Sequence, residues 1–169
     1  MGKRLRLLNT LANVVIPTMF FAALAANAVT AKPCADTRVD LRGDWGQVSF
    51  VVTLADTPKN RARGLMYVGH LPKRNGMLFI YPSESEVGFW MKNTLIPLDM
   101  LFFDAKGRMT GLHQNAQPHD LTPKFGGETV KYVLEINGGL SKVYGINEQT
   151  VLRHPALGVA GIWPCEKHR

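Results

Sequence analysis

The stretch "GFWMKNTLIPLDMLFF", residues 88–103, combines the densest apolar run of the chain with a few charged and polar side chains. Successive side chains of a β-strand point to opposite faces. The first half of the stretch therefore places Phe89 and Met91 on one face and Trp90 and Lys92 on the other. A strand that only contributed to a core would not need Lys92, so the presence of this lysine indicates a further role for this half of the stretch.

The second half of the stretch is the predicted strand 98–103, in which Asp99 shares a face with Leu101 and Phe103. A carboxylate on an apolar face costs free energy unless it is ion-paired or hydrogen-bonded. Asp99 either belongs to a ligand site or has a structural partner. In the structural interpretation it accepts backbone N–H groups from a neighbouring loop, or it pairs with Lys92, Arg61 or Arg63.

The pattern of the rest of the chain predicts short strands separated by turns every eight to twelve residues, which is typical of a β-rich domain. We expect a mainly β fold (β-rich α+β), a single compact domain of mostly antiparallel strands with two short helices. Strands are predicted at 47–55, 76–81, 87–92, 98–103, 108–114, 129–137 and 150–154, with a turn at "PSESE" (82–86) and a long surface loop at 115–128. Helices are predicted within 56–67 and 138–145, the first capped by Asp56 or Thr57, with Pro58 in its first turn and Gly64 near its end.

The first 31 residues have the organisation of an export signal. A basic start is followed by an apolar stretch that ends in small residues, and cleavage after Ala28 or Ala31 fits this pattern. Residues 32–169 would then be the mature domain, and its location would be periplasmic or secreted. The alternative is an uncleaved N-terminal anchor. No later segment is long and apolar enough to span a bilayer, so no stable membrane span is expected after cleavage.

The only two cysteines, Cys34 and Cys165, stand near the two ends of this mature domain. In an exported protein such a pair predicts one disulfide that joins the ends. The alternative is a redox or metal pair, but no CxxC spacing supports it.

Charge and motifs exclude several classes of function. Removing Lys3, Arg4 and Arg6 leaves 17 basic against 13 acidic residues, a net charge of +4 without a strong basic patch, so we expect no nucleic-acid partner. No GxSxG, HExxH or phosphate-binding glycine loop is present. We expect no cofactor and no metal. His113, His119 and Asp120 lack tight ligand spacing, and the four methionines 66, 77, 91 and 100 are better explained as core residues than as copper ligands.

Glu135 poses the same question as Asp99, because it follows apolar residues in the predicted strand 129–137. Polar side chains that converge within an apolar frame are typical of ligand pockets. The predicted ligand-binding residues are Arg63, Trp90, Lys92, Asn93, Asp99 and Glu135.

Four strings, "RARGLM", "GMLFIY", "FWMKNTLIPLDMLFFD" and "YVLEINGG", occur in this order, and together they closely resemble the family called domain of unknown function 192. The resemblance runs from about residue 48 to 152. It implies a small, mostly β domain that is often exported in bacteria, and it implies no reaction. The signature residues carried over are Arg63, Gly64, Leu65, Met66, Gly76, Met77, Phe89, Trp90, Met91, Lys92, Asn93, Thr94, Pro97, Asp99, Glu135 and Gly138.

Three functions follow from these observations. The first is an exported binding domain that holds a small polar ligand or a cell-envelope component at a cluster around Lys92 and Asp99. The second is a hydrolase or lyase, in which Asp99 or Glu135 would act as a general base and Lys92 or Arg63 would stabilise negative charge. No other catalytic residue is assigned. The third is a structural or partner-binding domain, which predicts an exposed apolar patch and no good pocket.

Overall fold

The computed structural model describes residues 33–165, all within one compact unit. The predicted export signal, residues 1–31, lies outside the described residues. The strands are β1 (Arg38–Gly43), β2 (Gly46–Ala55), β3 (Asn75–Ser85), β4 (Gly88–Phe89), β5 (Leu98–Phe103), β6 (Met109–Ala116), β7 (Lys124–Phe125), β8 (Val130–Asn137) and β9 (Val151–Arg153). The helices are α1 (Pro58–Arg63), α2 (Leu140–Tyr144) and the 3-10 helix η1 (Pro155–Ala160).

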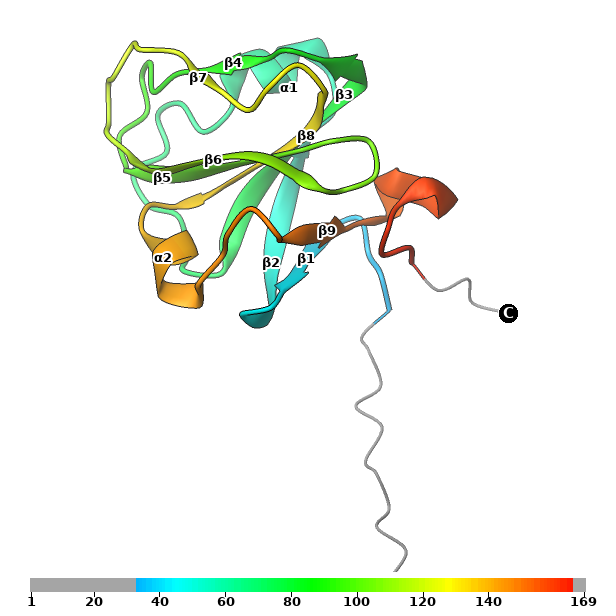
Figure 1. The fold of residues 1–169 in the computed structure, drawn as a ribbon. Helices are drawn as coiled ribbons and strands as arrows, with labels where there is room; N and C mark the ends of the chain where they lie inside the picture. The colour runs from blue at the N-terminus through cyan, green and yellow to red at the C-terminus, as the bar shows by residue number, and fades with distance from the viewer. Residues whose placement is uncertain (1–32, 166–169) are drawn as a thin grey trace, which may run out of the picture. The chain divides into compact units, whose positions relative to one another are not determined.

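Seven strands form one curled sheet in the order β6-β5-β8-β3-β2-β1-β9, and β4 pairs with β7 in a separate small sheet (Figure 1). Strands account for 44% of the structure and helices for 13%, which confirms the mainly β prediction. All pairs are antiparallel except β2 with β3, which are parallel and are joined by α1. This connection places α1 at the end of the sheet where β4 also lies (Figure 1).

Each face of the sheet carries its own apolar cluster, so the central strands are buried on both sides. All six residues of β5 are buried. Leu101 and Phe103 pack in the first cluster with Leu134 of β8, and Met100 and Phe102 pack in the second cluster. A strand buried on both faces reads as a continuous apolar run, and this explains the composition of residues 98–103.

Both predicted helices are present within their predicted ranges. Thr57, not Asp56, caps α1, because its Oγ1 accepts a hydrogen bond from the Asn60 N–H at 3.2 Å. Pro58 occupies the first helical turn and Gly64 ends the helix. The second predicted helix is α2.

Three local predictions were wrong, and two elements were missed. The predicted turn 82–86 largely continues β3, with a register shift between Ile80 and Ser85. The predicted strand 87–92 contains only the two residues of β4, and the predicted loop 115–128 contains β7. β1 and η1 were not predicted. In β1, Arg38, Asp40 and Arg42 alternate with Val39 and Leu41, which is the pattern of a short strand.

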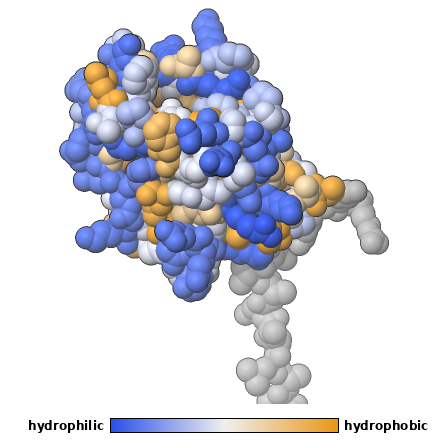
Figure 2. Space-filling model, turned by 45° about the horizontal axis from the view of Figure 1, so that its top comes forward, coloured by the Kyte–Doolittle hydropathy of each residue, from blue (hydrophilic) through white to orange (hydrophobic). Residues whose placement is uncertain are grey.

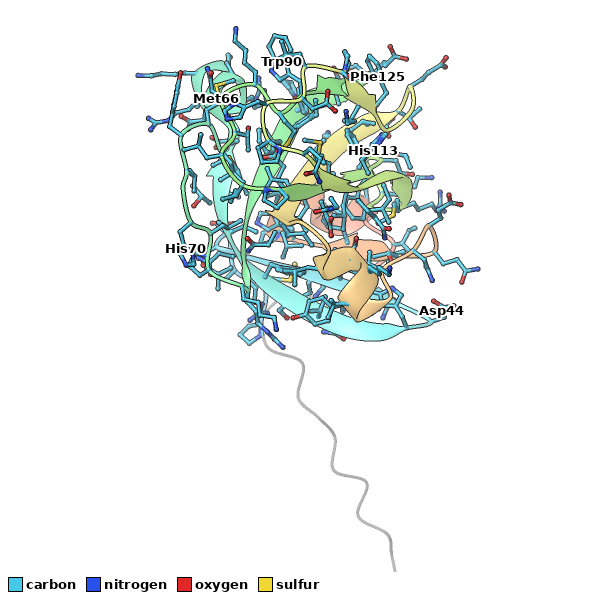
Figure 3. The ribbon with its side chains drawn as sticks, turned by 90° about the vertical axis from the view of Figure 1, so that its left-hand side faces the viewer. Asp44, Met66, His70, Trp90, His113 and Phe125 are labelled. Carbon is cyan, nitrogen blue, oxygen red and sulfur yellow. A yellow bond between two sulfur atoms is a disulfide. The ribbon has the colours of Figure 1, made fainter. Side chains whose placement is uncertain are left out.

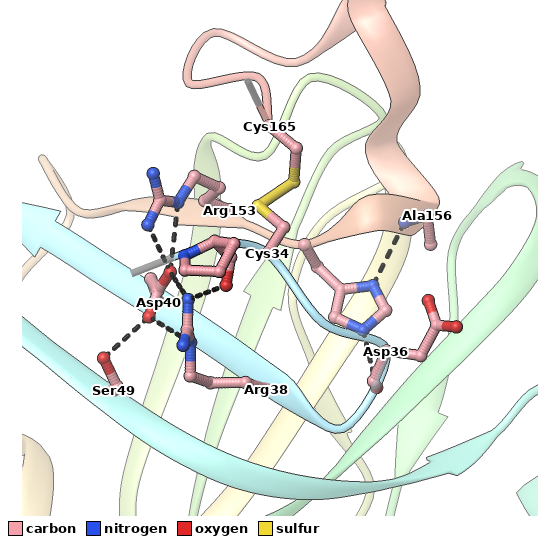
Figure 4. The surroundings of a disulfide bond; sticks show 10 residues. Cys34, Asp36, Arg38, Asp40, Ser49, Arg153, Ala156 and Cys165 are labelled. Carbon is pink, nitrogen blue, oxygen red and sulfur yellow. Dashed lines mark hydrogen bonds and ion pairs between the residues drawn. A yellow bond between two sulfur atoms is a disulfide. The ribbon is translucent and has the colours of Figure 1, made fainter. Parts of the chain in front are cut away.

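The two ends of the described chain meet at the disulfide Cys34–Cys165, as predicted (Figure 4). Beside it, buried Asp40 accepts hydrogen bonds from Arg153 at 2.6 Å and from Ser49 at 2.6 Å, and pairs with Arg38 at 3.1 Å. Burial alone would raise the pKa of Asp40, but the hydrogen bonds from Ser49 and Arg153 and the two positive charges lower it. This satisfied cluster fixes β9 against β1.

Candidate functional site

The main candidate site is a pocket of about 310 Å³ at the end of the sheet that carries α1 and β4. Its walls come from α1 and the residues after it, from β3, from β4 and the turn after it, and from β8. Figure 3 shows Met66 and Trp90 at this end, with His70 and Asp44 at the opposite end. The lining residues are Arg61, Ala62, Arg63, Gly64, Leu65, Met66, Phe79, Tyr81, Gly88, Phe89, Trp90, Lys92, Thr94 and Glu135.

Glu135 is a buried acidic residue of this pocket, with only 4% of its surface exposed. Its position on β8 is opposite Met77 of β3 and Met100 of β5. Among the described residues its carboxyl group has no hydrogen-bond partner, and the Oε2 atom is fully buried. Burial raises the pKa of Glu135 to about 8, because the charged form loses its hydration and gains nothing in return.

Gly64 gives the backbone close access to this carboxyl group. Its φ of 51° lies in the left-handed region, which favours glycine. A Cβ atom at this position would approach Phe79 Cζ to 3.3 Å and Glu135 Oε2 to 4.0 Å. A side chain at this position would therefore crowd Phe79 and contact Glu135.

Three cationic side chains surround the pocket. Arg61 is held in place: its guanidinium donates to the carbonyl oxygens of Asp56 at 2.6 Å and Ile80 at 2.9 Å, and it lies 5.1 Å from the centre of the Tyr81 ring. The Lys92 Nζ atom lies 5.2 Å from the Trp90 ring.

Arg63 and Lys92 are exposed, and within residues 33–165 neither side chain makes a hydrogen bond or an ion pair. Their charges are therefore available to a ligand.

Tyr81 lines the pocket beside Arg61 and Glu135. Burial raises the pKa of its hydroxyl group, a charge on Glu135 would raise it further, and Arg61 acts to lower it. The hydroxyl group is therefore neutral across the physiological range and can donate or accept a hydrogen bond.

Asn93 supports the pocket without lining it. Its φ of 56° is in the left-handed region, and its carbonyl oxygen accepts a hydrogen bond at 2.8 Å from the N–H of Tyr67, which also has a positive φ of 63°. This contact ties the turn after β4 to the loop after α1. The Asn93 Nδ2 atom lies 3.9 Å from the Met66 sulfur.

Asp99 lies on the other face of the sheet and does not reach the pocket. Its side chain is fully buried, and Oδ1 accepts hydrogen bonds from the N–H groups of Asn115 at 2.7 Å and Gly139 at 2.8 Å. Oδ2 accepts a third from the N–H of Ser141 at 2.7 Å. Of the two interpretations of Asp99, the geometry matches the structural one, in which it accepts backbone N–H groups.

Of the predicted ligand-binding residues, Arg63, Trp90, Lys92 and Glu135 come together in the pocket, whereas Asn93 and Asp99 do not line it. The predicted juxtaposition of Lys92 and Asp99 is therefore wrong, because β4 pairs with β7 and not with β5. The predicted ligand-binding residues did not include Arg61 or Tyr81, which also line the pocket. The repeated arginines of "RARG" and the polar end of the run "GMLFIY" were the available signals.

Within residues 33–165, no group of three or more His, Cys, Asp or Glu side chains is arranged to hold a metal ion. His113 contacts the Phe125 carbonyl oxygen at 2.8 Å (labelled in Figure 3), and Asp120 pairs with Lys124 at 2.7 Å. In the same part of the chain, no helix has the length and apolar character needed to cross a membrane.

The fold and site thus define a small β-rich domain with a buried, unpaired carboxyl group in a cationic pocket. The family model DUF192, described as "Uncharacterized ACR", matches residues 39–154, and the chain belongs to this family. The match confirms the resemblance and contains every residue that lines the pocket. Most of these lining residues are also among the family signature residues.

Two solved structures have similar folds. A protein of unknown function from Novosphingobium aromaticivorans is 36% identical, with a TM-score of 0.67 over 68% of this chain and 82% of that one. A protein from Sinorhizobium meliloti, named for a suspected role as a transcription regulator, is 38% identical, with a TM-score of 0.69 over 73% of this chain and 97% of that one. The comparison with curated proteins gave no match.

Proposed function

We propose that this protein is an exported binding domain that holds a small polar ligand, free or part of a cell-envelope component, in the Glu135 pocket. The observation that carries the proposal is the unpaired, buried carboxyl group of Glu135 inside an open pocket. Nearly all buried polar groups in proteins have a hydrogen-bond partner, so an exception in a pocket points to a partner that is a ligand.

The size and lining of the pocket support this proposal. A volume of about 310 Å³ is at the small end of the range found for ligand pockets. Phe79, Phe89 and Leu65 supply apolar walls, and a few polar groups remain to orient a ligand. The partner-binding alternative predicted a surface without a good pocket, and the pocket weighs against it. Hydrophobic residues at this end form separate patches among hydrophilic ones (Figure 2).

Export is supported by the signal-like residues 1–31 and by a disulfide, which is stable in oxidising compartments. Expression of the full chain in a Gram-negative bacterium, followed by fractionation and intact-mass measurement, tests this part. We expect a periplasmic protein that begins after Ala28 or Ala31. An intact chain in the membrane fraction would support the anchor, and an intact chain in the cytoplasm would refute export.

Binding is tested with a panel of small aromatic compounds that carry acidic, neutral or basic groups. The panel is added to ¹⁵N-labelled residues 32–169, and the signals of the Trp90 indole N–H and the Gly64 amide are followed. The control is Ala62→Trp, which fills the pocket from an exposed position of α1. We expect at least one compound to shift both signals in the wild type but not in the variant. If no compound does so, the binding proposal is wrong.

A second candidate function is proton-transfer catalysis by Glu135, as a hydrolase or lyase. The specific observation is that its pKa is raised to about 8, near the pH at which a general acid or base works best. Arg63 and Lys92 are placed at the same pocket and can stabilise developing negative charge. Asp99 is a poor general base, because three backbone N–H groups occupy its oxygens.

The test for catalysis is hydrolysis of small activated esters and lactones by the wild type and by Glu135→Gln. Catalysis by Glu135 requires that the wild type is active, that the rate changes with a midpoint near pH 8, and that the variant loses the activity. An activity that survives in Glu135→Gln would come from another site.

A further inference from the structure

We propose that the ligand is a small organic anion whose acidic group lies between the Glu135 carboxyl group and the Arg63 and Lys92 side chains. This inference rests on the proposed binding function and names the chemical class of the ligand. It follows from the charges that face the pocket, from the groups that are already engaged, and from the way in which a buried carboxyl group can make a hydrogen bond.

The charges that face the pocket are three cations and one carboxyl group. Arg61 is already engaged by two carbonyl oxygens and the Tyr81 ring. Arg63 and Lys92 remain available for hydrogen bonds and ion pairs. An incoming anion would therefore meet two available positive charges, whereas an incoming cation would be repelled by both.

The Glu135 carboxyl group fits an anion as well, provided that it carries its proton. A protonated carboxyl group donates one hydrogen bond, and the natural acceptor is an ionised oxygen. Neither of its oxygens has a partner among the described residues, and Oε2 is fully buried whereas Oε1 is not, so a ligand can reach Oε1. An acidic ligand group would supply this partner, so that the two acidic groups would share a single proton.

Binding of an anion should then require the protonated form of Glu135. The titratable and charged groups around it are Arg61 and Arg63 from α1, Tyr81 from β3, and Lys92 from the turn after β4. With a Glu135 pKa of about 8, the protonated fraction falls roughly tenfold between pH 7 and pH 9. The affinity for an anion should fall to the same extent over this interval.

The test uses three probes of similar size whose charges do not change in this pH range: benzoate, benzyl alcohol and benzyltrimethylammonium. Their binding to residues 32–169 is measured at pH 7 and pH 9 from the Trp90 indole and Gly64 amide signals. The control variant is Glu135→Gln, which keeps a hydrogen-bond donor but cannot ionise. The variant Arg63→Gln with Lys92→Gln removes the two available cations.

We expect benzoate to bind most tightly at pH 7, to bind about tenfold more weakly at pH 9, and to lose this pH dependence in Glu135→Gln. The double variant should bind benzoate more weakly at both pH values. Preferential binding of benzyltrimethylammonium, or benzoate binding that does not change with pH, would overturn the anion inference and leave the pocket as a ligand site. Absence of binding by all three probes at millimolar concentration would overturn the anion inference as well, and the wider panel would then decide the proposed function separately.

Discussion

Asp99 and Glu135 are two buried carboxyl groups on adjacent strands, and their surroundings differ completely. In the register of β5 with β8, Asp99 lies opposite Ile136 and Glu135 lies opposite Met100, so the two side chains point to opposite faces of the sheet. Asp99 accepts three backbone hydrogen bonds, whereas Glu135 accepts none from the described residues. The two side chains are buried to nearly the same extent, and they differ in their hydrogen bonds.

This comparison separates a residue that stabilises the fold from a residue that destabilises it. The backbone N–H groups around Asp99 replace the water that its carboxylate loses on burial. Nothing replaces that water around Glu135, so its folded state favours the protonated form. A protein retains such a group at a cost in stability when a site requires it. The four predictions below test this difference, from the largest expected effect to the smallest.

Replacing Asp99 by Ala should lower the free energy of unfolding by about 5 kcal/mol, because three backbone N–H groups lose their shared acceptor, and the bond from Ser141 is buried. Urea unfolding followed by circular dichroism measures this. The control is Asp104→Ala, which removes a partly exposed acceptor of two turn N–H groups, from Lys106 and Arg108, and should cost about 1 kcal/mol. If Asp99→Ala does not fold, Asp99→Asn should fold with a smaller loss. Equal losses at positions 99 and 104 would contradict the role given to Asp99.

Replacing Glu135 by Met should raise the free energy of unfolding by about 3 kcal/mol at pH 7. The pKa of Glu135 is raised from 4.5 to about 8, so the folded state binds the proton more tightly than the unfolded state. Below pH 4.5 both states are protonated and the penalty is absent; it grows as the pH rises and is complete above pH 8. The gain in Glu135→Met should therefore shrink toward pH 4.5.

The matched control for this prediction is Glu128→Met, which changes an exposed glutamate and should shift stability by less than about 0.5 kcal/mol at either pH. Thermal unfolding at pH 4.5 and pH 7 measures both variants. A destabilised Glu135→Met protein would mean that Glu135 supports the fold, and the contrast with Asp99 would fail.

Replacing Gly64 by Ala should cost about 2 kcal/mol and should reduce probe binding in the pocket. The left-handed backbone is strained for alanine, and the new Cβ atom approaches Phe79 and Glu135. Gly46→Ala is the control, because Gly46 has a φ of 113° but no atom within 4 Å of the added Cβ. Both variants should lose stability, but only Gly64→Ala should lose binding. Binding that survives in Gly64→Ala would place the ligand elsewhere.

Replacing Lys92 by Met should change the free energy of unfolding by less than about 0.5 kcal/mol, because the exposed ammonium group makes no ion pair within residues 33–165. Benzoate binding should weaken, since one available positive charge is lost. Lys73→Met, an exposed change outside the pocket lining, is the control and should leave binding unchanged. A large loss of stability in Lys92→Met would give this lysine a structural role.

Much of the architecture could be predicted from local patterns. The strands at 98–103 and 129–137 and the helix after Thr57 stand out because their apolar period or capping residues act within a few positions. The alternation of β1 is present in the sequence, but the burial of Asp40 could not be predicted from it, because its partner Arg153 is more than a hundred residues away. Local patterns contain no information about such a distant partner.

The sequence by itself determined the β-rich class, the family, the joining of the two ends by cysteines, and the two carboxyl groups that needed explanation. Only the tertiary structure decided that Asp99 and Glu135 face opposite sides of the sheet, and that Arg63, Trp90 and Lys92 meet at the side of Glu135. The physical reason is that alternation defines two faces within each strand, but only the pairing register shows which faces of different strands coincide. That register depends on contacts between segments that are far apart in the chain.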